Sequence, residues 1–229
     1  MTDEAPPPPI LPLGDAELRV VMSLVEKQAT VPESYPLTLN ALRSACNQST
    51  SRFPVVAYDE RTVMDALDSL KARKVLRFVH PGAGARTTRY RHVLDEALDL
   101  APDELALLAV LALRGPQAPG ELRTRAERLH AFASLAEVEE VLERLAGRDQ
   151  PLAVHLPRQP GQKEARWAHL LSGPDAVVVE AASAAPAASG SSRSSVDPDR
   201  IERLEREVAT LRRQLAQLYE AIGEDLPGL

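Results

Sequence analysis

The chain has 229 residues, which is enough for two small domains with flexible tails. Its hydrophobic content of 44% supports packed cores, and a single cysteine excludes an internal disulfide and a cysteine-rich zinc site. The acidic, proline-rich start does not follow the order of a signal peptide, and no apolar run reaches the roughly 18 residues of a membrane span. We therefore expect a cytoplasmic protein of bacterial type that has no contact with membranes.

The net charge of −6 conceals an asymmetry along the chain. Residues 14–92 carry 12 Lys and Arg against 8 Asp and Glu, a net of +4, whereas residues 93–172 carry 9 against 13, a net of −4. Residues 197–229 carry 5 against 8, a net of −3. If any part of the chain meets nucleic-acid phosphates, the first of these segments is the one suited to it.

The first third of the chain predicts a winged-helix domain over residues 14–94, preceded by a disordered proline-rich arm at 1–13. Apolar spacing of three and four residues predicts helices at 15–30, at about 38–47 and from Asp59 onward. Residues 75–80 and 87–92 alternate as strands around a turn that contains Pro81 and Gly82. Three helices followed by a two-stranded hairpin are typical of a winged helix.

The second third repeats the pattern and predicts another winged helix over residues 100–172. The spacing of Val63, Leu67 and Leu70 recurs 75 residues later in the predicted third helix, which Ser134 and Glu137 begin with capping-box spacing. A helix at 102–114 is apolar nearly all round, so we expect it to pack between domains or subunits. A helix from 119 to about 130 and strands at 152–156 and 166–170 complete the domain.

The rest of the chain predicts a flexible linker at 173–198 and a coiled-coil helix at 199–223. In that helix, apolar residues alternate at spacings of three and four, with Ile201, Val208, Leu215 and Ile222 at the a positions and leucine at every d position. This pattern favours a parallel homodimer, and a solvated single helix is the alternative. The predicted dimer core consists of Ile201, Leu204, Val208, Leu211, Leu215, Leu218 and Ile222.

Several long motifs resemble a known family. They are VEKQ at 25–28, PESYPL at 32–37, ACNQ at 45–48 with Arg52 beyond it, LRGPQAPGELR at 113–123 and RLHAF at 128–132. Over residues 13–172 these motifs resemble the YceH family of bacterial proteins. The resemblance implies a tandem winged-helix fold, and it supplies no catalytic or ligand residue to assign to this chain.

The sequence gives no sign of an active site, a metal centre or a cofactor. The five histidines are scattered, and none of them has the spacing of a metal site. Cys46 lies on the apolar face of its predicted helix, where cysteine usually acts as a small core residue. No nucleophile elbow, phosphate-binding loop or carboxylate pair is present. We therefore expect a protein that is not an enzyme and that needs no metal or cofactor.

Two functional hypotheses remain open. One is a DNA-binding, regulator-like dimer that contacts double-stranded DNA through the first domain, although the acidic Asp65 and Asp68 on its third helix oppose phosphate contact. The other is a protein-interaction or scaffold module that binds no nucleic acid and meets another protein through the acidic second domain. The candidate DNA-contacting residues are Arg52, Arg61, Arg77, Arg86, Arg89 and Arg91.

Overall fold

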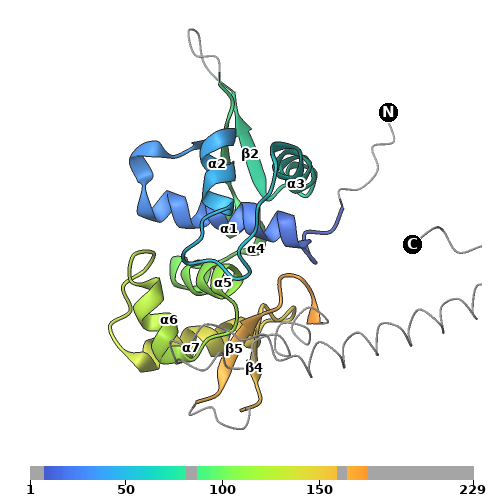
Figure 1. Cartoon of the computed structure of the whole chain (residues 1–229). Coiled ribbons are helices and arrows are strands. Elements are labelled where there is room, and N and C mark those ends of the chain that lie inside the picture. Colours follow the sequence, from blue (N-terminus) through green and yellow to red (C-terminus); the bar gives the residue numbers. More distant parts are fainter. Residues whose placement is uncertain (1–7, 81–86, 159–163, 175–229) are drawn as a thin grey trace, which may run out of the picture. The chain divides into compact units, whose positions relative to one another are not determined.

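The computed structural model describes residues 8–80, 87–158 and 164–174 (Figure 1). In this part the chain is mainly helical with two small antiparallel sheets, which confirms the predicted α+β class. The predicted linker from residue 175 and the coiled coil lie outside these ranges. The elements are α1 (Asp15–Thr30), the 3-10 helix η1 (Pro32–Ser34), β1 (Leu37–Thr38), α2 (Leu39–Cys46), α3 (Glu60–Ala72), β2 (Leu76–Val79), β3 (Arg89–His92), α4 (Leu94–Leu98), α5 (Pro102–Arg114), α6 (Pro119–Ala126), α7 (Leu135–Ala146), β4 (Ala153–Leu156) and β5 (Arg166–His169).

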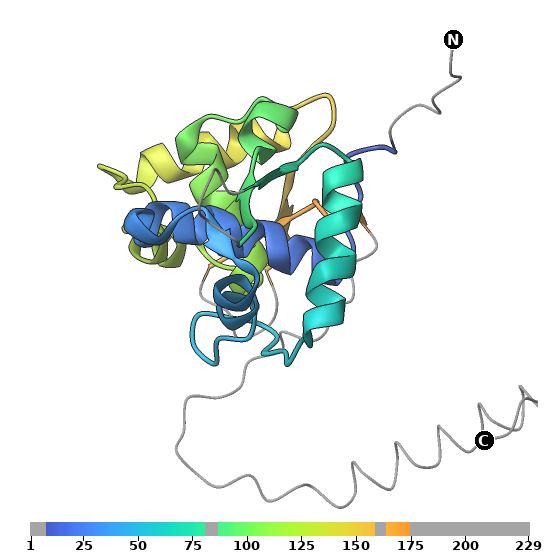
Figure 2. The ribbon, with the colours of Figure 1, turned by 90° about the horizontal axis from the view of Figure 1, so that it is seen from above.

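Helices α1 and α5 form the centre of the described chain. They pack against each other, α1 also contacts α2 and α3, and α5 also contacts α6, α7 and β5 (Figures 1 and 2). Helix α5 is buried from Ala106 to Leu113, as its continuous apolar sequence predicts. We call α1 to α4 with the first sheet the first series, and α5 to α7 with the second sheet the second series. One large hydrophobic core runs through both series.

The first sheet has the order β1–β3–β2, with all neighbours antiparallel. The two-residue strand β1 was not predicted, and neither was the short helix α4, because segments of two and five residues are too short to show a period. In β2 and β3, Leu76, Tyr90 and His92 face the core, while the cross-strand pair Arg77 and Arg91 lies on the opposite face. The hairpin thus has one buried and one outward face.

Residues 8–13 are held against the protein, although they were expected to belong to a disordered arm. Leu13 is buried, and its amide donates to the Leu171 carbonyl at 2.8 Å. Arg73, which follows α3, donates to the Pro9 and Pro12 carbonyls at 2.7 and 3.1 Å. Because proline has no backbone N–H, a proline-rich segment offers few donors to its own carbonyls. Here the Arg73 guanidinium supplies the hydrogen bonds.

An equivalent arginine follows α7. Arg148 donates to the Leu98 carbonyl at 2.6 Å and lies 3.7 Å from the Glu104 carboxylate. Arg73 likewise lies 3.2 Å from Glu17. The two arginines therefore have equivalent roles. Arg73 links the segment before α1 to Glu17 in α1, and Arg148 links the segment before α5 to Glu104 in α5.

Helix α6 ends at Ala126 rather than near residue 130. The Leu129 and His130 amides both donate to the Ala126 carbonyl, at 2.7 and 2.9 Å, and this turn places Phe132 in the core. Helix α7 begins as predicted, because the Ser134 hydroxyl accepts from the Glu137 amide at 3.1 Å. The β4–β5 hairpin then follows.

Candidate functional site

Helix α7 turns three carboxylates toward solvent. Its buried side consists of Val138, Val141, Leu142 and Leu145, spaced by three and four residues. This spacing leaves Glu139, Glu140 and Glu143 exposed on the opposite side. No hydrogen bond or ion pair joins any of these three carboxylates to the residues that the structure describes. They are therefore available to an external cation.

Opposite this helix, the β4–β5 hairpin contributes an aromatic pair. His155 and Trp167 are cross-strand partners, with ring centroids 5.2 Å apart and planes at 78°. The Trp167 backbone is fixed by paired hydrogen bonds with Gln117, at 2.8 and 3.0 Å. Trp167 is the single tryptophan of the chain, and it is 5% exposed. The indole is therefore rigidly placed, with its exposed part in the space between hairpin and helix.

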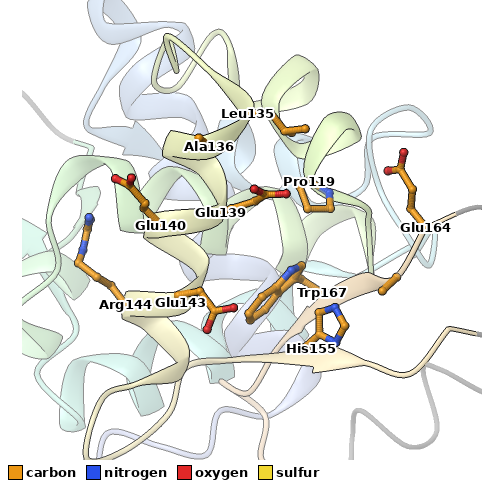
Figure 3. Close-up of a pocket in the computed structure, with 11 residues that line it drawn as sticks. Pro119, Leu135, Ala136, Glu139, Glu140, Glu143, Arg144, His155, Glu164 and Trp167 are labelled. Atoms are coloured by element: carbon orange, nitrogen blue, oxygen red, sulfur yellow. The ribbon is translucent and has the colours of Figure 1, made fainter.

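Between α7 and the hairpin lies an open cavity of about 1120 Å³. Figure 3 shows Glu139 and Glu143 pointing from α7 toward the side of Trp167 and His155, and Glu140 pointing away from it. We call this cavity the acidic groove. Its rim also includes the exposed Leu135, so the groove combines negative charge with apolar and aromatic surface.

Among the residues that the structure describes, the one arginine lining the acidic groove is already paired inside the protein. Arg144 lies 2.7 Å from the Asp103 carboxylate and 3.5 Å from that of Glu104. Burial on its own would raise the pKa of Asp103, but its hydrogen bond with Arg144 holds that pKa below the ordinary value. The arginine therefore does not neutralise the groove carboxylates.

The first series of elements presents a basic outward face on its hairpin. Arg77 and Arg91 are cross-strand partners, and both approach one carboxylate, that of Glu96, at 3.1 and 3.6 Å. Arg89 lies on the same face and donates to the Pro36 carbonyl at 2.8 Å. Three of the candidate arginines thus share a surface, but one acid and two backbone carbonyls, those of Ser34 and Pro36, already engage them.

The other candidate arginines do not join that surface. Arg52 is buried and bonds Glu26 and backbone carbonyls, so its placement at a nucleic-acid interface was wrong. An arginine in a loop looks exposed in the sequence, but its acidic partner lies 26 positions earlier. Arg61 is exposed at the start of α3 and lies 3.9 Å from Asp65. Arg86 falls outside the described residues, as do all seven predicted coiled-coil positions.

Within the described ranges, no group of three or more His, Cys, Asp or Glu side chains could hold a metal ion. No helix among the same residues is long and apolar enough to cross a membrane. Cys46 is buried, and burial raises the pKa of its thiol to about 11. The thiol is therefore protonated at neutral pH and unreactive.

These features define an α+β protein with a central helix pair, a basic hairpin face and an acidic groove. The chain belongs to the family described as protein of unknown function DUF480, whose model matches residues 13–162. This is the same family as the YceH-type and UPF0502 proteins. A UPF0502 protein of Geobacter sulfurreducens is 52% identical over 200 residues, covering 87% of this chain and 90% of the relative. A UPF0502 protein of Delftia acidovorans is 44% identical over 225 residues, covering 96% and 97%.

Proposed function

We propose that this protein is a non-catalytic interaction module whose acidic groove binds a basic segment of another protein. The observation that carries the proposal is the set of unpaired carboxylates on one side of the groove, opposite a fixed tryptophan. A lysine or arginine side chain entering there gains charge-assisted hydrogen bonds to Glu139 or Glu143 and a cation–π contact with Trp167. The same charges repel nucleic acid, which leaves a basic polypeptide as the matching partner.

We infer a tandem winged-helix framework for this module. The inference is supported by the element order, since three helices and a hairpin occur twice, and by the equivalent places of Arg73 and Arg148. The heptad tail at 199–223 adds a proposed parallel dimer, which would present two acidic grooves on one particle. Two grooves would raise the avidity for a partner that carries repeated basic segments.

The single tryptophan allows a direct test. A short peptide of alternating lysine and alanine is titrated into the full-length protein while the Trp167 emission is followed, with a glutamate–alanine peptide as the charge-reversed probe. We expect a saturable change with the basic peptide alone, and weaker binding at higher salt because the attraction is electrostatic.

A pair of variants with equal net charge tests whether the peptide binds in the acidic groove. E139Q/E143Q removes two groove charges, while E33Q/E127Q removes two exposed charges elsewhere and has the same net charge. We expect roughly tenfold weaker binding, about 1.4 kcal/mol, for the groove variant alone. Equal affinity of the two variants, or equal binding of both peptides, would remove the proposal.

The second candidate function is binding of double-stranded DNA by the first winged helix. It is supported by Arg77, Arg89 and Arg91 lying on one outward face of the hairpin. A hairpin of this kind can follow the phosphate backbone, and phosphate contacts supply much of the affinity for DNA. The observation against DNA binding is Glu96, which forms ion pairs with two of these arginines, Arg77 and Arg91.

Glu96 therefore provides the sharp test of the DNA hypothesis. Fluorescence anisotropy with duplex DNA at two salt concentrations should show salt-dependent binding, which E96Q strengthens and R86A/R89A/R91A weakens for every sequence tried. E127Q changes the net charge as E96Q does and should leave the affinity unchanged. If E96Q and E127Q behave alike, the hairpin face is not the DNA-binding surface.

A further inference from the structure

A second cavity, of about 190 Å³, lies at the junction of the two series of helices. The last turn of α1, the loop after α2, the end of α5 and the end of α6 all contribute to its lining. Four cationic side chains line it: Lys27, Arg114, Arg125 and Arg128. We call it the arginine pocket. The motifs VEKQ, ACNQ, LRGPQAPGELR and RLHAF, which carry the family resemblance, all reach or adjoin it.

The carboxylate at this pocket is already neutralised. Glu26 accepts from Arg52 through both oxygens, at 3.0 and 2.7 Å, and lies 2.9 Å from the Lys27 ammonium. Burial alone would raise the pKa of Glu26, but these hydrogen bonds hold that pKa below the ordinary value. Glu26 thus already serves two cations, and its effect on Arg114 is opposed by the nearby Arg125 and Arg52 guanidinium groups.

Arg114 is the unusual member of the cluster. It is half-buried at the end of α5, and no hydrogen bond or ion pair joins it to any described residue. Burial lowers the pKa of Arg114, and the nearby Arg125 guanidinium lowers it further. Arg128 is likewise without such a partner in the described ranges, whereas Arg125 bonds Gln117 and lies 3.1 Å from Glu121. A partly desolvated guanidinium beside a like charge is costly unless an acceptor reaches it.

Helix ends explain only part of this charge. Several helices finish near the pocket, and each C-terminal end carries roughly half a negative charge that favours a nearby cation. At the end of α2, however, the buried Arg52 already donates to the Ala45 carbonyl, at 2.9 Å. At the end of α5, the Gly115 amide bonds the Leu111 carbonyl, and no bond from Arg114 to a carbonyl is present in the described chain.

We infer that the arginine pocket binds a phosphate group. Guanidinium groups present forked donors that match phosphate oxygens, and the Gln48 amide and Ser51 hydroxyl in the lining can add neutral hydrogen bonds. The Gln48 carbonyl oxygen already accepts from Lys27 and Arg52, at 3.2 and 2.8 Å, so the amide NH2 is the part of that side chain left to donate.

The volume limits the ligand. A cavity of 190 Å³ is below the roughly 300 Å³ at which sites for whole drug-sized molecules begin, but it has room for about six waters at ~30 Å³ each. One phosphate group fits, either as the free ion or as the end of a small ester whose remainder stays outside. The site is distinct from the acidic groove, and its charge is opposite.

The test uses the full-length protein with inorganic phosphate, pyrophosphate and adenosine monophosphate, each at constant ionic strength. Calorimetric titration and the melting temperature are both recorded. We expect saturable binding of at least one phosphate compound, with a rise in melting temperature, and binding at least ~tenfold weaker in R114Q/R128Q. The matched control is R61Q/R123Q, which removes two exposed arginines outside the pocket lining and should bind like the wild type. The compound that binds most tightly shows whether the pocket prefers free phosphate or the phosphate group of an ester.

The ligand-free stability of R114Q separates a binding role from a structural one. If Arg114 serves a ligand, the variant without phosphate should melt at the wild-type temperature or above it, because repulsion with Arg125 is relieved. A lower melting temperature together with an unchanged phosphate response would show that Arg114 is a helix cap, and would overturn the inference. An equal phosphate response in the wild type and in R114Q/R128Q would also overturn it.

Discussion

Arg52 and Glu26 form a two-pronged ion pair that ties the loop after α2 to helix α1, with Nη1 3.0 Å from Oε1 and Nη2 2.7 Å from Oε2. The Arg52 side chain has no exposed surface, and its remaining donors reach the Ala45 and Ser51 carbonyls. Because charges at such depth are stable only when fully paired, this guanidinium organises the polar interior at the meeting point of α1 and α2.

Replacing Arg52 with alanine should therefore be strongly destabilising. The change leaves the Glu26 carboxylate buried with Lys27 as its remaining partner, and removing one member of a buried ion pair typically costs about 3–5 kcal/mol. Urea denaturation followed by circular dichroism measures the free energy of unfolding. The matched control is R61A, whose exposed pair with Asp65 should contribute less than about 1 kcal/mol. A loss below 1 kcal/mol for R52A would contradict the structural role.

Stability should fall as the pH drops from about 6.5 toward 4, partly because of His169. Burial lowers the pKa of this imidazole from 6.5 to about 4. Between these values the unfolded chain binds a proton that the folded chain does not, so acidification favours unfolding by up to ~1.4 kcal/mol per pH unit. Burial also lowers the pKa of His92, which acts in the same direction.

The variant H169Q isolates this contribution. Denaturation series at several pH values should give a slope of unfolding free energy against pH that is shallower than in the wild type by up to one proton. An unchanged slope in H169Q would mean that His169 takes up its proton without unfolding.

Replacing Arg73 or Arg148 with alanine should lower the free energy of unfolding by similar amounts. Each side chain donates hydrogen bonds to carbonyls of the segment that precedes α1 or α5. Hydrogen bonds from charged groups typically contribute about 1.5–3 kcal/mol. Thermal and urea denaturation of R73A and R148A measure the loss. R123A, on an exposed site with one bond of 3.3 Å to Ala133, should change stability by no more than about 0.5 kcal/mol. A large effect for one arginine alone would argue against equivalent roles.

Much of the fold could be predicted because most elements are long enough to repeat an apolar period. Helix α1 has the predicted bounds, and the continuous burial of α5 follows from a sequence without a polar side. The strand β1 could not be found, since Leu37 and Thr38 become a strand only by pairing with Tyr90 and Arg89 far along the chain.

The candidate sites were only partly predictable, because a local apolar period can be seen in the sequence and pairing between distant segments cannot. The glutamates on α7 could be found from sequence, because a helix period assigns them to the exposed side. Trp167 could not be placed opposite them, since its position depends on pairing with His155 and Gln117. Arg52 and Arg114 look alike in sequence, and the distant Glu26 alone determines that one is paired and the other is not.

The heptad tail makes a final prediction about assembly, which we expect to be a dimer reinforced by residues 199–223. Deleting residues 197–229 should lower the apparent dimer stability in sedimentation experiments, because three heptads of a and d contacts are lost. A point-variant pair keeps the length constant: L211E/L218E places two charges at d positions, while A209E/A216E places the same charges at b positions on the outer face. We expect the first to shift sedimentation toward the monomer and the second to leave it unchanged. If both variants and the truncated protein remain as dimeric as the intact chain, the heptads serve a different partner.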